Sequence, residues 1–427
     1  MDIRTAAKAA KKAAIQLGAI ETVLKNKALQ AIADALWTNK EKILEANEKD
    51  LAFSRKNNLA KPLLKRLKFD EKKLAETISG IESLIALPDP VGVTLSAREL
   101  DEGLELYQVT CPIGVIGVIF ESRPDALVQI STLCLKSGNG VLLKGGSEAA
   151  HTNRTLADVI VSASQSTGIP TGWLQLLETR EHVEEMLKMD ESIDLLVPRG
   201  SNEFVKFIMD NSNIPVLGHA DGVCHVYVDE DADLTMASNI VVDAKCQYVA
   251  VCNAAETLLV HQTVAGKFLP MVKKALSAHE VELRGCPKTE AIIKVKSATE
   301  EDWHTEYLDT ILAVKVVNSP EEAIEHINTY GSGHTDTIVT ANQSTANLFM
   351  SLVDSANVFW NCSTRFSDGF RYGLGAEVGI STSKIHARGP VGLEGLVIYK
   401  WQIRGSGQIV ADYTEGRRKF SHRPLKK

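Results

Sequence analysis

The chain has 427 residues, with 47 basic and 54 acidic side chains and a formal net charge of −7. Hydrophobic residues make up 44% of it and charged residues 24%, which excludes collagen-like, low-complexity and disordered polypeptides. The acidic balance and the scattered lysines argue against a nucleic-acid partner and against docking on an anionic membrane. We therefore expect two or three globular domains and a small-molecule partner.

Cysteine usage and hydropathy indicate a cytoplasmic protein. The seven cysteines form an odd set without a CxxC pair, which favours free thiols in a reducing compartment. The longest strongly apolar stretch, 113–120, is far shorter than the about 20 residues that cross a bilayer. The Ala- and Lys-rich segment 1–17 also fits an organelle transit peptide, but the helical pattern continues beyond it and favours a helix of the fold.

The first ninety residues carry the periodicity of amphipathic helices. Apolar residues recur at helical spacing over 29–37 and again over 74–85. Thr38 and Glu41 have the spacing of a capping box, and Asp70 is placed to cap the next helix. We predict helices throughout this region, ended by the two prolines at 88 and 90.

The pattern then changes to short strands. A β-hairpin is predicted around the turn 101–103. From residue 115, short apolar runs alternate with helical stretches, as in a buried parallel sheet with crossover helices. These runs are 115–120, 141–143, 174–177, 193–197 and 223–228. The alternation predicts an α/β protein with a nucleotide-binding fold.

A second series of strands begins near residue 229, so we place a domain boundary at about 226. Its predicted elements are strands 256–260, 311–317 and 337–339 and a helix from 264. Near the C-terminus, 396–401 and 408–410 are strand-like and follow no helix. We expect these last segments to pair with the earlier hairpin or with another subunit.

Cys252 is a candidate nucleophile. It stands in the segment Gln-Tyr-Val-Ala-Val-Cys-Asn, before a predicted strand, where a thiol can face a cleft between domains. A thiolate is well suited to attack on an acyl carbon. Most cysteines, however, serve as buried packing, and the local sequence leaves both interpretations open.

Two glycine-containing turns are candidates for nucleotide binding. Gly200 and Ser201 lie between an apolar run and a predicted helix, where free amides can hold a phosphate, although Ser201 is more simply explained as a helix cap. Lys144 and Glu148 lie where a strand turns into a helix and could hold a ribose, or belong to a solvated loop.

Other apparent motifs are discounted. The segment 373–379 resembles a dinucleotide fingerprint, but its spacing is off by one and it lies far from a βαβ start, so we predict a loop. His219, Cys224 and His225 suggest zinc, yet the last two lie in one predicted strand and no second ligand pair follows, so no metal is expected. Because no GxxxxGK[ST] element is present, the chain should not make an acyl phosphate from ATP.

Taken together, these segments resemble the aldehyde dehydrogenase superfamily and, more closely, its γ-glutamyl phosphate reductase family. The resemblance spans nearly the whole chain. Its most specific motifs are Cys111-Pro-Ile-Gly-Val-Ile-Gly-Val-Ile-Phe-Glu-Ser-Arg-Pro-Asp125, Gly218-His-Ala-Asp-Gly-Val-Cys-His-Val-Tyr227 and Ala250-Val-Cys-Asn-Ala-Ala-Glu-Thr257. It implies a Rossmann-type NADP-binding domain (1–95 and 112–225), an α/β catalytic domain (226–393), a small β oligomerisation element (96–111 and 394–412) and a C-terminal tail (413–427).

The resemblance also implies site residues. The nucleophile would be Cys252, and the substrate-binding residues would be Arg123, Asn253 and Arg365. The cofactor-binding residues would be Lys144 on the adenosine ribose, Gly200 and Ser201 at the pyrophosphate, and Glu306 on the nicotinamide ribose.

The implied activity is the NADPH-dependent reduction of L-glutamate 5-phosphate (γ-glutamyl phosphate) to L-glutamate 5-semialdehyde and phosphate through a cysteine thioester. This is a step of proline biosynthesis, which implies a functional link to glutamate 5-kinase. The hairpin 95–111 and the C-terminal strands favour a homo-oligomer. The alternatives are a hydrolytic NAD(P)-dependent aldehyde dehydrogenase and a non-catalytic binding protein of the same fold. The choice of NADPH over NADH is not decided by the sequence.

Three departures from general aldehyde dehydrogenases refine this expectation. The stretch 219–222 lacks the glutamate that activates water, so hydrolysis of a thioester should be poor. Arg123 replaces the oxyanion asparagine, and a guanidinium suits a phosphate or carboxylate better than a neutral carbonyl. Cys362 stands where the family usually has a small residue.

Overall fold

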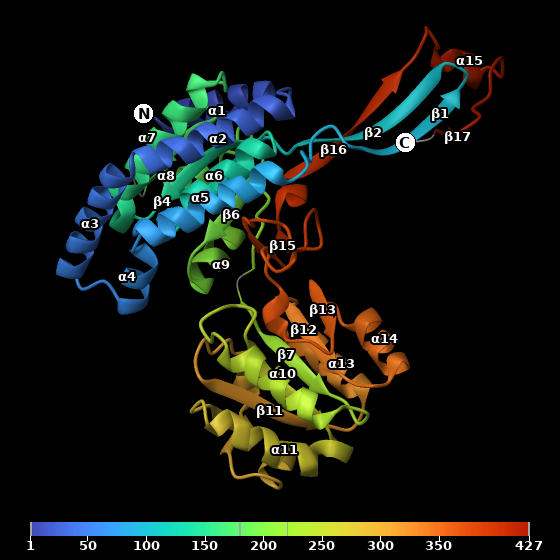
Figure 1. Cartoon of the computed structure of the whole chain (residues 1–427). Coiled ribbons are helices and arrows are strands. Elements are labelled where there is room, and N and C mark those ends of the chain that lie inside the picture. The colour runs from blue at the N-terminus through green and yellow to red at the C-terminus, as the bar shows by residue number, and fades with distance from the viewer. Residues whose placement is uncertain (1, 179–180, 220, 426–427) are drawn as a thin grey trace.

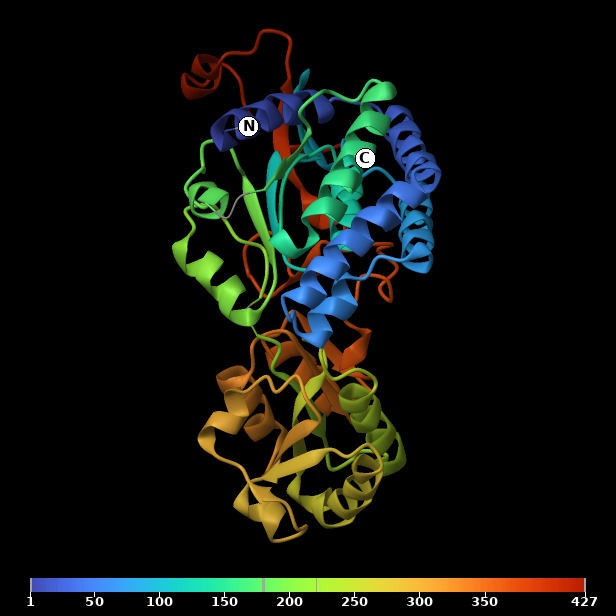
Figure 2. The same ribbon diagram turned by 90° about the vertical axis from the view of Figure 1, so that its left-hand side faces the viewer.

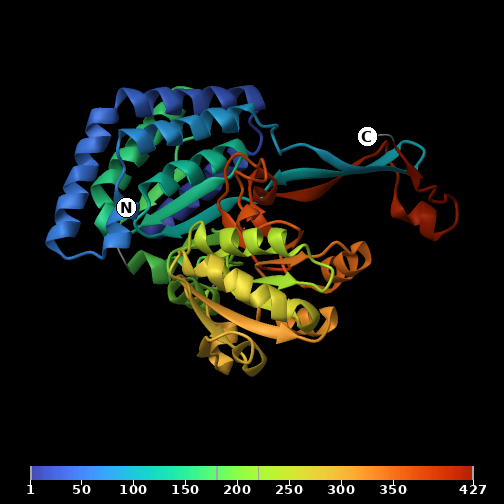
Figure 3. The same ribbon diagram turned by 60° about the horizontal axis from the view of Figure 1, so that its bottom comes forward.

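The computed structural model describes residues 2–178, 181–219 and 221–425. Two α/β bodies lie one above the other, and a long arm of strands projects from the first (Figure 1). The chain enters the sheet of the second body at Cys224 and leaves it after Trp360. A side view shows the two bodies end to end (Figure 2), and a third view shows the arm reaching beyond both (Figure 3).

The first body contains a parallel sheet in the order β5-β4-β3-β6. The strands are β3 (Val115–Phe120), β4 (Gly140–Gly145), β5 (Leu174–Leu177) and β6 (Leu195–Arg199). One face is covered by α1 (Ile3–Leu17), α8 (Glu181–Met186) and α9 (Asn202–Asn211). The other face is covered by α6 (Pro124–Lys136) and α7 (Ala150–Ser166). Helices α2 (Thr22–Thr38), α3 (Lys40–Lys56) and α5 (Glu71–Ala86) pack on these two, and α4 (Lys61–Leu67) packs on α3. Every residue of β3 and β4 is therefore buried.

Local signals account for most helix starts. The Asp70 side chain accepts from the Lys73 amide at 3.0 Å, so the predicted cap of α5 is confirmed. The predicted capping box at Thr38 is wrong, because the Thr38 hydroxyl donates to the Asp34 carbonyl at 2.8 Å as the last residue of α2. Trp37 closes the predicted apolar stripe but is exposed, with the Lys40 ammonium over its ring.

The second body contains a parallel sheet of seven strands in the order β10-β9-β11-β8-β7-β12-β13. The strands are β7 (Cys224–Val228), β8 (Ala255–His261), β9 (Glu282–Gly285), β10 (Lys296–Ser297), β11 (Ile311–Val317), β12 (Thr335–Val339) and β13 (Asn357–Trp360). Helices α10 (Leu234–Cys246) and α11 (Gln262–Ser277) cover one face, and α13 (Pro320–Tyr330) and α14 (Gln343–Leu352) cover the other. The strands and the helix that the sequence predicts here are confirmed.

The arm is an antiparallel sheet in the order β16-β2-β1-β17. Its strands are β1 (Thr94–Asp101), β2 (Leu104–Pro112), β16 (Val397–Arg404) and β17 (Arg423–Pro424). The predicted hairpin and its pairing with a C-terminal strand are confirmed. Because β17 pairs with β1, part of the tail that the sequence sets apart belongs to this sheet.

The predicted strand 408–410 is wrong. Gly407 adopts a φ of 104°, which turns the chain. The Gln408 side chain then donates to the Glu102 carbonyl at 3.0 Å, and the helix α15 (Val410–Thr414) follows.

The remaining short elements are α12 (Pro287–Glu290), η1 (Ser147–Ala149), η2 (Glu300–His304), η3 (Thr364–Phe366), η4 (Leu393–Leu396), β14 (Gly379–Ser381) and β15 (Gly389–Val391). The predicted loop 373–379 is confirmed up to Gly379, where β14 starts. Among the residues described, none of the helices combines the length and the apolar character that crossing a bilayer requires.

Candidate active site

The two sheets contribute opposite strand ends to the candidate site. In the first body, Arg123, Lys144 and Gly200 lie at the carboxyl ends of β3, β4 and β6. In the second body, Cys252 and Glu306 precede β8 and β11, at the amino ends of their strands. The predicted site residues therefore lie at the carboxyl ends of the strands in the first sheet and at the amino ends of the strands in the second.

The Cys252 backbone is held from several sides. A Cβ added at Gly222 would lie 2.1 Å from the Cys252 carbonyl oxygen and 2.5 Å from its Cα, so only glycine allows this approach. The Cys224 thiol donates to the same carbonyl at 3.2 Å. Next to the nucleophile, the buried Asn253 side chain donates to the Ser367 carbonyl at 2.8 Å, and Thr364 donates to the Asn253 carbonyl at 2.7 Å. The structure thus gives Asn253 a positioning contact.

Two histidines lie beside the Cys252 thiol. One ring nitrogen of His219, one of His334 and the Cys252 sulfur all lie within 4.8 Å of one another. His219 Nδ1 is 2.9 Å from the Ile380 carbonyl, which can only accept, so Nδ1 carries the proton. Burial lowers the pKa of His219, which favours the neutral ring and leaves Nε2 with a lone pair.

His334 was not singled out by the sequence analysis. Its ring is fully buried and meets the His219 ring edge-on at 4.7 Å. Its Nδ1 lies 2.8 Å from the Thr335 hydroxyl, and its Nε2 has no hydrogen-bond partner among the described residues. The only sequence signal was its position directly before an apolar strand. The trio considered for zinc does not form, because His225 instead pairs with Asp336 at 2.8 Å inside the sheet.

Arg365 lies near Cys252. Its Nε donates to the Gln247 side chain at 2.9 Å, in the segment that leads to Cys252. Burial and the charge of Arg371 lower the pKa of Arg365, whereas Cys252 acts in the opposite direction, as a nearby group of opposite sign does. Arg365 is therefore placed to bind an anion beside the thiol.

Arg123 lies at the N-cap of α6. Burial is the largest cause that lowers the pKa of Arg123, and the charges of Arg199 and Arg66 lower it further, while Asp125 and Tyr248 act in the opposite direction. Three guanidinium groups that repel one another fit a bound multivalent anion such as a phosphate.

The predicted cofactor residues of the first body lie along one sheet edge. Lys144 and Pro198 pair with Ile119 from either side of β3, and the Lys144 ammonium donates to the Gly145 carbonyl at 2.5 Å. Ser201 accepts from the Phe204 amide at 3.4 Å, so its reading as a helix cap is confirmed. Glu148 accepts from the amide and the hydroxyl of Ser122 at 2.7 and 2.8 Å, which ties it to its own body.

Glu306 joins the two bodies. The Asn202 side chain, at the start of α9, donates to the Glu306 carboxylate and to Asp221 at 3.1 Å. Gly222 donates its amide to Glu306 as well, while burial raises the pKa of Glu306. Glu306 thus lies between the α9 start and the glycine that packs on Cys252. Ala220, in the same stretch, lies outside the described residues.

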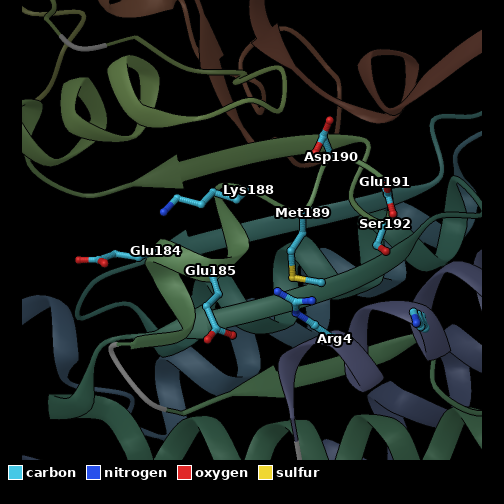
Figure 4. Close-up of a pocket in the computed structure, with 9 residues that line it drawn as sticks. Arg4, Glu184, Glu185, Lys188, Met189, Asp190, Glu191 and Ser192 are labelled. Carbon is cyan, nitrogen blue, oxygen red and sulfur yellow. The ribbon is translucent and has the colours of Figure 1, made fainter.

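A separate cavity of about 940 Å³ lies away from these residues. Its walls come from α1 and from the segment 184–192, including Arg4, Glu185 and Met189 (Figure 4). The nearby Asp194 accepts from the Val115 amide, so this cavity lies at the amino ends of β3 and β6. Ligands of open parallel sheets bind at the carboxyl ends, and we therefore do not assign this cavity to the cofactor.

Known proteins match this chain over its whole length. Residues 1–299 match the model described as "Aldehyde dehydrogenase family". A curated protein named gamma-glutamyl phosphate reductase from Acetivibrio thermocellus is 66% identical, over 100% of this chain and 99% of its own. One of the same name from Pelotomaculum thermopropionicum is 66% identical, over 100% and 98%.

A solved structure of gamma-glutamyl phosphate reductase from Thermotoga maritima has a TM-score of 0.94 and 43% identity to this chain. The match covers 96% of this chain and 100% of the solved one. Both the family model and full-length relatives with identities well above 30% support the same assignment. The chain belongs to the aldehyde dehydrogenase family and, within it, to the γ-glutamyl phosphate reductases.

Proposed function

We propose that this chain catalyses the NADPH-dependent reduction of γ-glutamyl phosphate to glutamate 5-semialdehyde and phosphate in proline biosynthesis, with Cys252 as the nucleophile. The observation that carries the proposal is one connected path of contacts. It runs from the start of α9 through Asn202 and Glu306 to Gly222, whose Cα packs on the Cys252 backbone. The path puts a thiol next to residues that suit a nucleotide.

The acyl-transfer step uses Cys252, His219 and Arg365 of the second half of the site together with Arg123 of the first body. His219 Nε2 accepts the thiol proton, and the Cys252 sulfur attacks the acyl carbon of γ-glutamyl phosphate. The bond between that carbon and the phosphate oxygen breaks, and a thioester remains on Cys252. The proton on His219 passes to the leaving phosphate, so the proton taken from the thiol ends on the product. Arg365 and Arg123 are the guanidinium groups available to hold the phosphate and the carboxylate of the substrate.

The residues at the edge of the first sheet fit a dinucleotide. A Cβ at Gly200 would lie 2.8 Å from the Phe204 ring and 2.9 Å from the Glu121 carboxylate, which favours glycine at this turn. Of the first-turn amides of α9 beside it, that of Phe204 is capped by Ser201, and the amides before it are placed to bind a phosphate. Lys144 would contact the adenosine ribose, and the Glu306 carboxylate would accept from the hydroxyls of the nicotinamide ribose. Bound NADPH supplies the hydride that reduces the acyl group. Preference for NADPH over NADH is tested by comparing kcat/KM with the two cofactors.

Loss of the thioester to water is disfavoured by the carboxylates near the site. Glu306 is engaged by Asn202 and Gly222, and the buried Glu256 is paired with the Lys245 ammonium at 2.5 Å. These donors occupy the oxygens of both carboxylates, although burial raises the pKa of both groups, that of Glu256 to about 7. The acyl group is then kept for reduction, as a reductase requires.

Reverse-direction assays separate this function from a hydrolytic aldehyde dehydrogenase. Glutamate 5-semialdehyde and NADP should give NADPH only when phosphate is supplied, because phosphate must release the acyl group from Cys252. NADPH formation at the same rate without phosphate would favour the hydrolytic enzyme. Absence of nicotinamide-cofactor binding would favour a non-catalytic protein.

We also propose that the arm mediates homo-oligomer formation. Tyr399, Trp401 and Ile403 alternate along β16, an edge strand, and each is about half exposed or more. An exposed apolar edge strand favours pairing with another chain. Sedimentation should show an oligomer that Trp401→Lys dissociates.

The substrate must come from a kinase, glutamate 5-kinase, because acyl phosphates require a phosphoryl donor.

A further inference from the structure

Three side-chain atoms that can bind a metal ion lie close together in the candidate active site. They are the Cys252 sulfur and one ring nitrogen each of His219 and His334, all within 4.8 Å of one another. His219 has its Nδ1 proton fixed by the Ile380 carbonyl, so its Nε2 offers a lone pair. His334 is fully buried, and its Nε2 has no hydrogen-bond partner among the described residues. Such an atom in a native structure requires an explanation, of which a bound ion is one.

The chemistry of the donor set selects a particular class of ion. One thiolate and two imidazoles suit Zn²⁺, with bonds of about 2.3 Å to sulfur and about 2.0 Å to nitrogen. Atoms at the observed separations reach one ion after side-chain movements of about 1 Å. Mg²⁺ and Ca²⁺ require oxygen ligands, and the cluster offers none. Three protein ligands also leave the fourth tetrahedral position open.

An ion can reach these atoms from solvent. Cys252 and His219 are both only half-buried, whereas His334 closes the cluster on the inner side. The zinc trio considered from the sequence does not form, because His225 pairs with Asp336 at 2.8 Å, although the Cys224 sulfur lies 3.7 Å from His334 Nδ1 at the border of the cluster. The structure replaces both of them with residues from two other segments.

We propose that Zn²⁺ binds reversibly to Cys252, His219 and His334 and thereby blocks the nucleophile. Binding displaces the Cys252 thiol proton to solvent and leaves both imidazoles neutral. The sulfur lone pair that would attack an acyl carbon is then shared with the metal. Zinc is therefore an inhibitor that occupies the acylation site, with an affinity that depends on all three ligands.

Zinc binding is measured on the full-length protein without substrate, so its outcome is independent of the proposed activity. Chelator-treated protein titrated calorimetrically with zinc chloride should bind one ion per chain, and magnesium chloride should give no signal. Cys252→Ser, His219→Gln and His334→Gln should each weaken zinc binding at least tenfold. Cys286→Ser is the matched control, because Cys286 is another half-buried thiol, one whose pKa is lowered by hydrogen bonds, and it should retain wild-type affinity.

A second readout uses the wild-type protein and does not depend on the folding of the buried His334 variant. Zinc should protect the Cys252 peptide from iodoacetamide, as followed by mass spectrometry, while the Cys286 peptide is alkylated as before. Co²⁺ in place of zinc should give a sulfur-to-metal charge-transfer band that Cys252→Ser abolishes. The proposal is overturned if no ion saturates the wild type, if both histidine variants keep full affinity, or if protection falls on Cys286 instead.

Discussion

The two parallel sheets of this protein contribute opposite ends of their strands to the same candidate site. The first sheet presents the carboxyl ends of β3, β4 and β6, and the second presents the amino ends of β7, β8, β11 and β12. At the carboxyl ends of the first sheet, strands β3 and β6 lead directly into the starts of helices α6 and α9. At the amino ends of the second sheet, the loops that join each preceding helix to its strand contain Cys252, His219 and His334.

The difference separates binding from reaction. Helix starts offer free amides and a positive dipole end, which suit the phosphates of a nucleotide. Loops at the amino ends have no such dipole, so reactivity there depends on side chains in fixed positions. Gly222 and the bonds of Asn253 provide this fixation on the second sheet. Two residues cross this division, since Arg123 of the first sheet is proposed to bind the substrate and Glu306 of the second to bind the cofactor. Substitutions around Cys252 should therefore mainly change kcat, and those at the start of α9 should mainly change cofactor binding.

Replacing the nucleophile should have the largest effect. Cys252→Ala should lower kcat for semialdehyde formation by at least about a thousandfold, because no other group can carry the acyl chain. NADPH binding, followed by fluorescence titration, should stay near wild type. Cys246→Ser, a half-buried thiol at the end of α10, is the control and should remain active. Substantial activity in Cys252→Ala would show that the reaction does not proceed through Cys252 at the amino ends of the second sheet.

Replacing His219 should have the next largest effect. His219→Gln should lower kcat by about a hundredfold, within the range for loss of a general base. Burial lowers the pKa of His219 from 6.5, so the base is lost only as pH falls below that value. The acid limb of kcat/KM should therefore lie below pH 6.5 in the wild type and be absent in the variant. An acid limb above pH 6.5, or one unchanged in His219→Gln, would contradict this role.

Filling the space at Gly222 should reduce activity about tenfold or more. The added methyl group of Gly222→Ala would have to displace the Cys252 backbone, and misplacement of a nucleophile by about 1 Å is costly. Gly266→Ala is the matched control, since a Cβ there meets no atom within 4 Å in the middle of α11. The control should keep full activity and raise stability slightly in urea unfolding. Equal behaviour of the two variants would show that the close approach at Gly222 is unimportant.

Breaking the connection at the first edge should have the smallest effect. Asn202→Ala removes the bonds to Glu306 and Asp221 and should raise KM for NADPH about fivefold, as loss of about 1 kcal/mol predicts. The kcat should change little. Asn211→Ala, at the other end of α9, is the control and should leave KM unchanged. A fall in kcat at constant KM would show that Asn202 acts in the reaction and not in cofactor binding, which would contradict this prediction.

The sequence predicted what depends on local pattern and on resemblance. Strands such as β3 and β11 were visible as apolar runs, and the cap at Asp70 follows from one residue type at one position. The α15 helix and the ending of α2 were missed, because a turn at Gly407 and a side-chain bond at Thr38 outweigh the local pattern.

The site itself was predicted unevenly. Cys252 could be named from its motif, whereas its role still rests on the proposal above. The position of His334 beside it depends on strand order across more than 80 residues of chain, which no local pattern contains. The bond between Asn202 and Glu306 crosses between the two bodies for the same reason. Contacts between distant segments are what the structure adds.

The account is tested most directly by identifying the residue that carries the acyl group. Wild-type protein would be supplied with γ-glutamyl phosphate made in place by a glutamate 5-kinase, without NADPH, then quenched in acid and digested. Mass spectrometry should find the glutamyl group on the peptide that contains Cys252, and addition of NADPH before the quench should remove it. A glutamyl group on another residue, or none on the protein while turnover proceeds, would contradict the account.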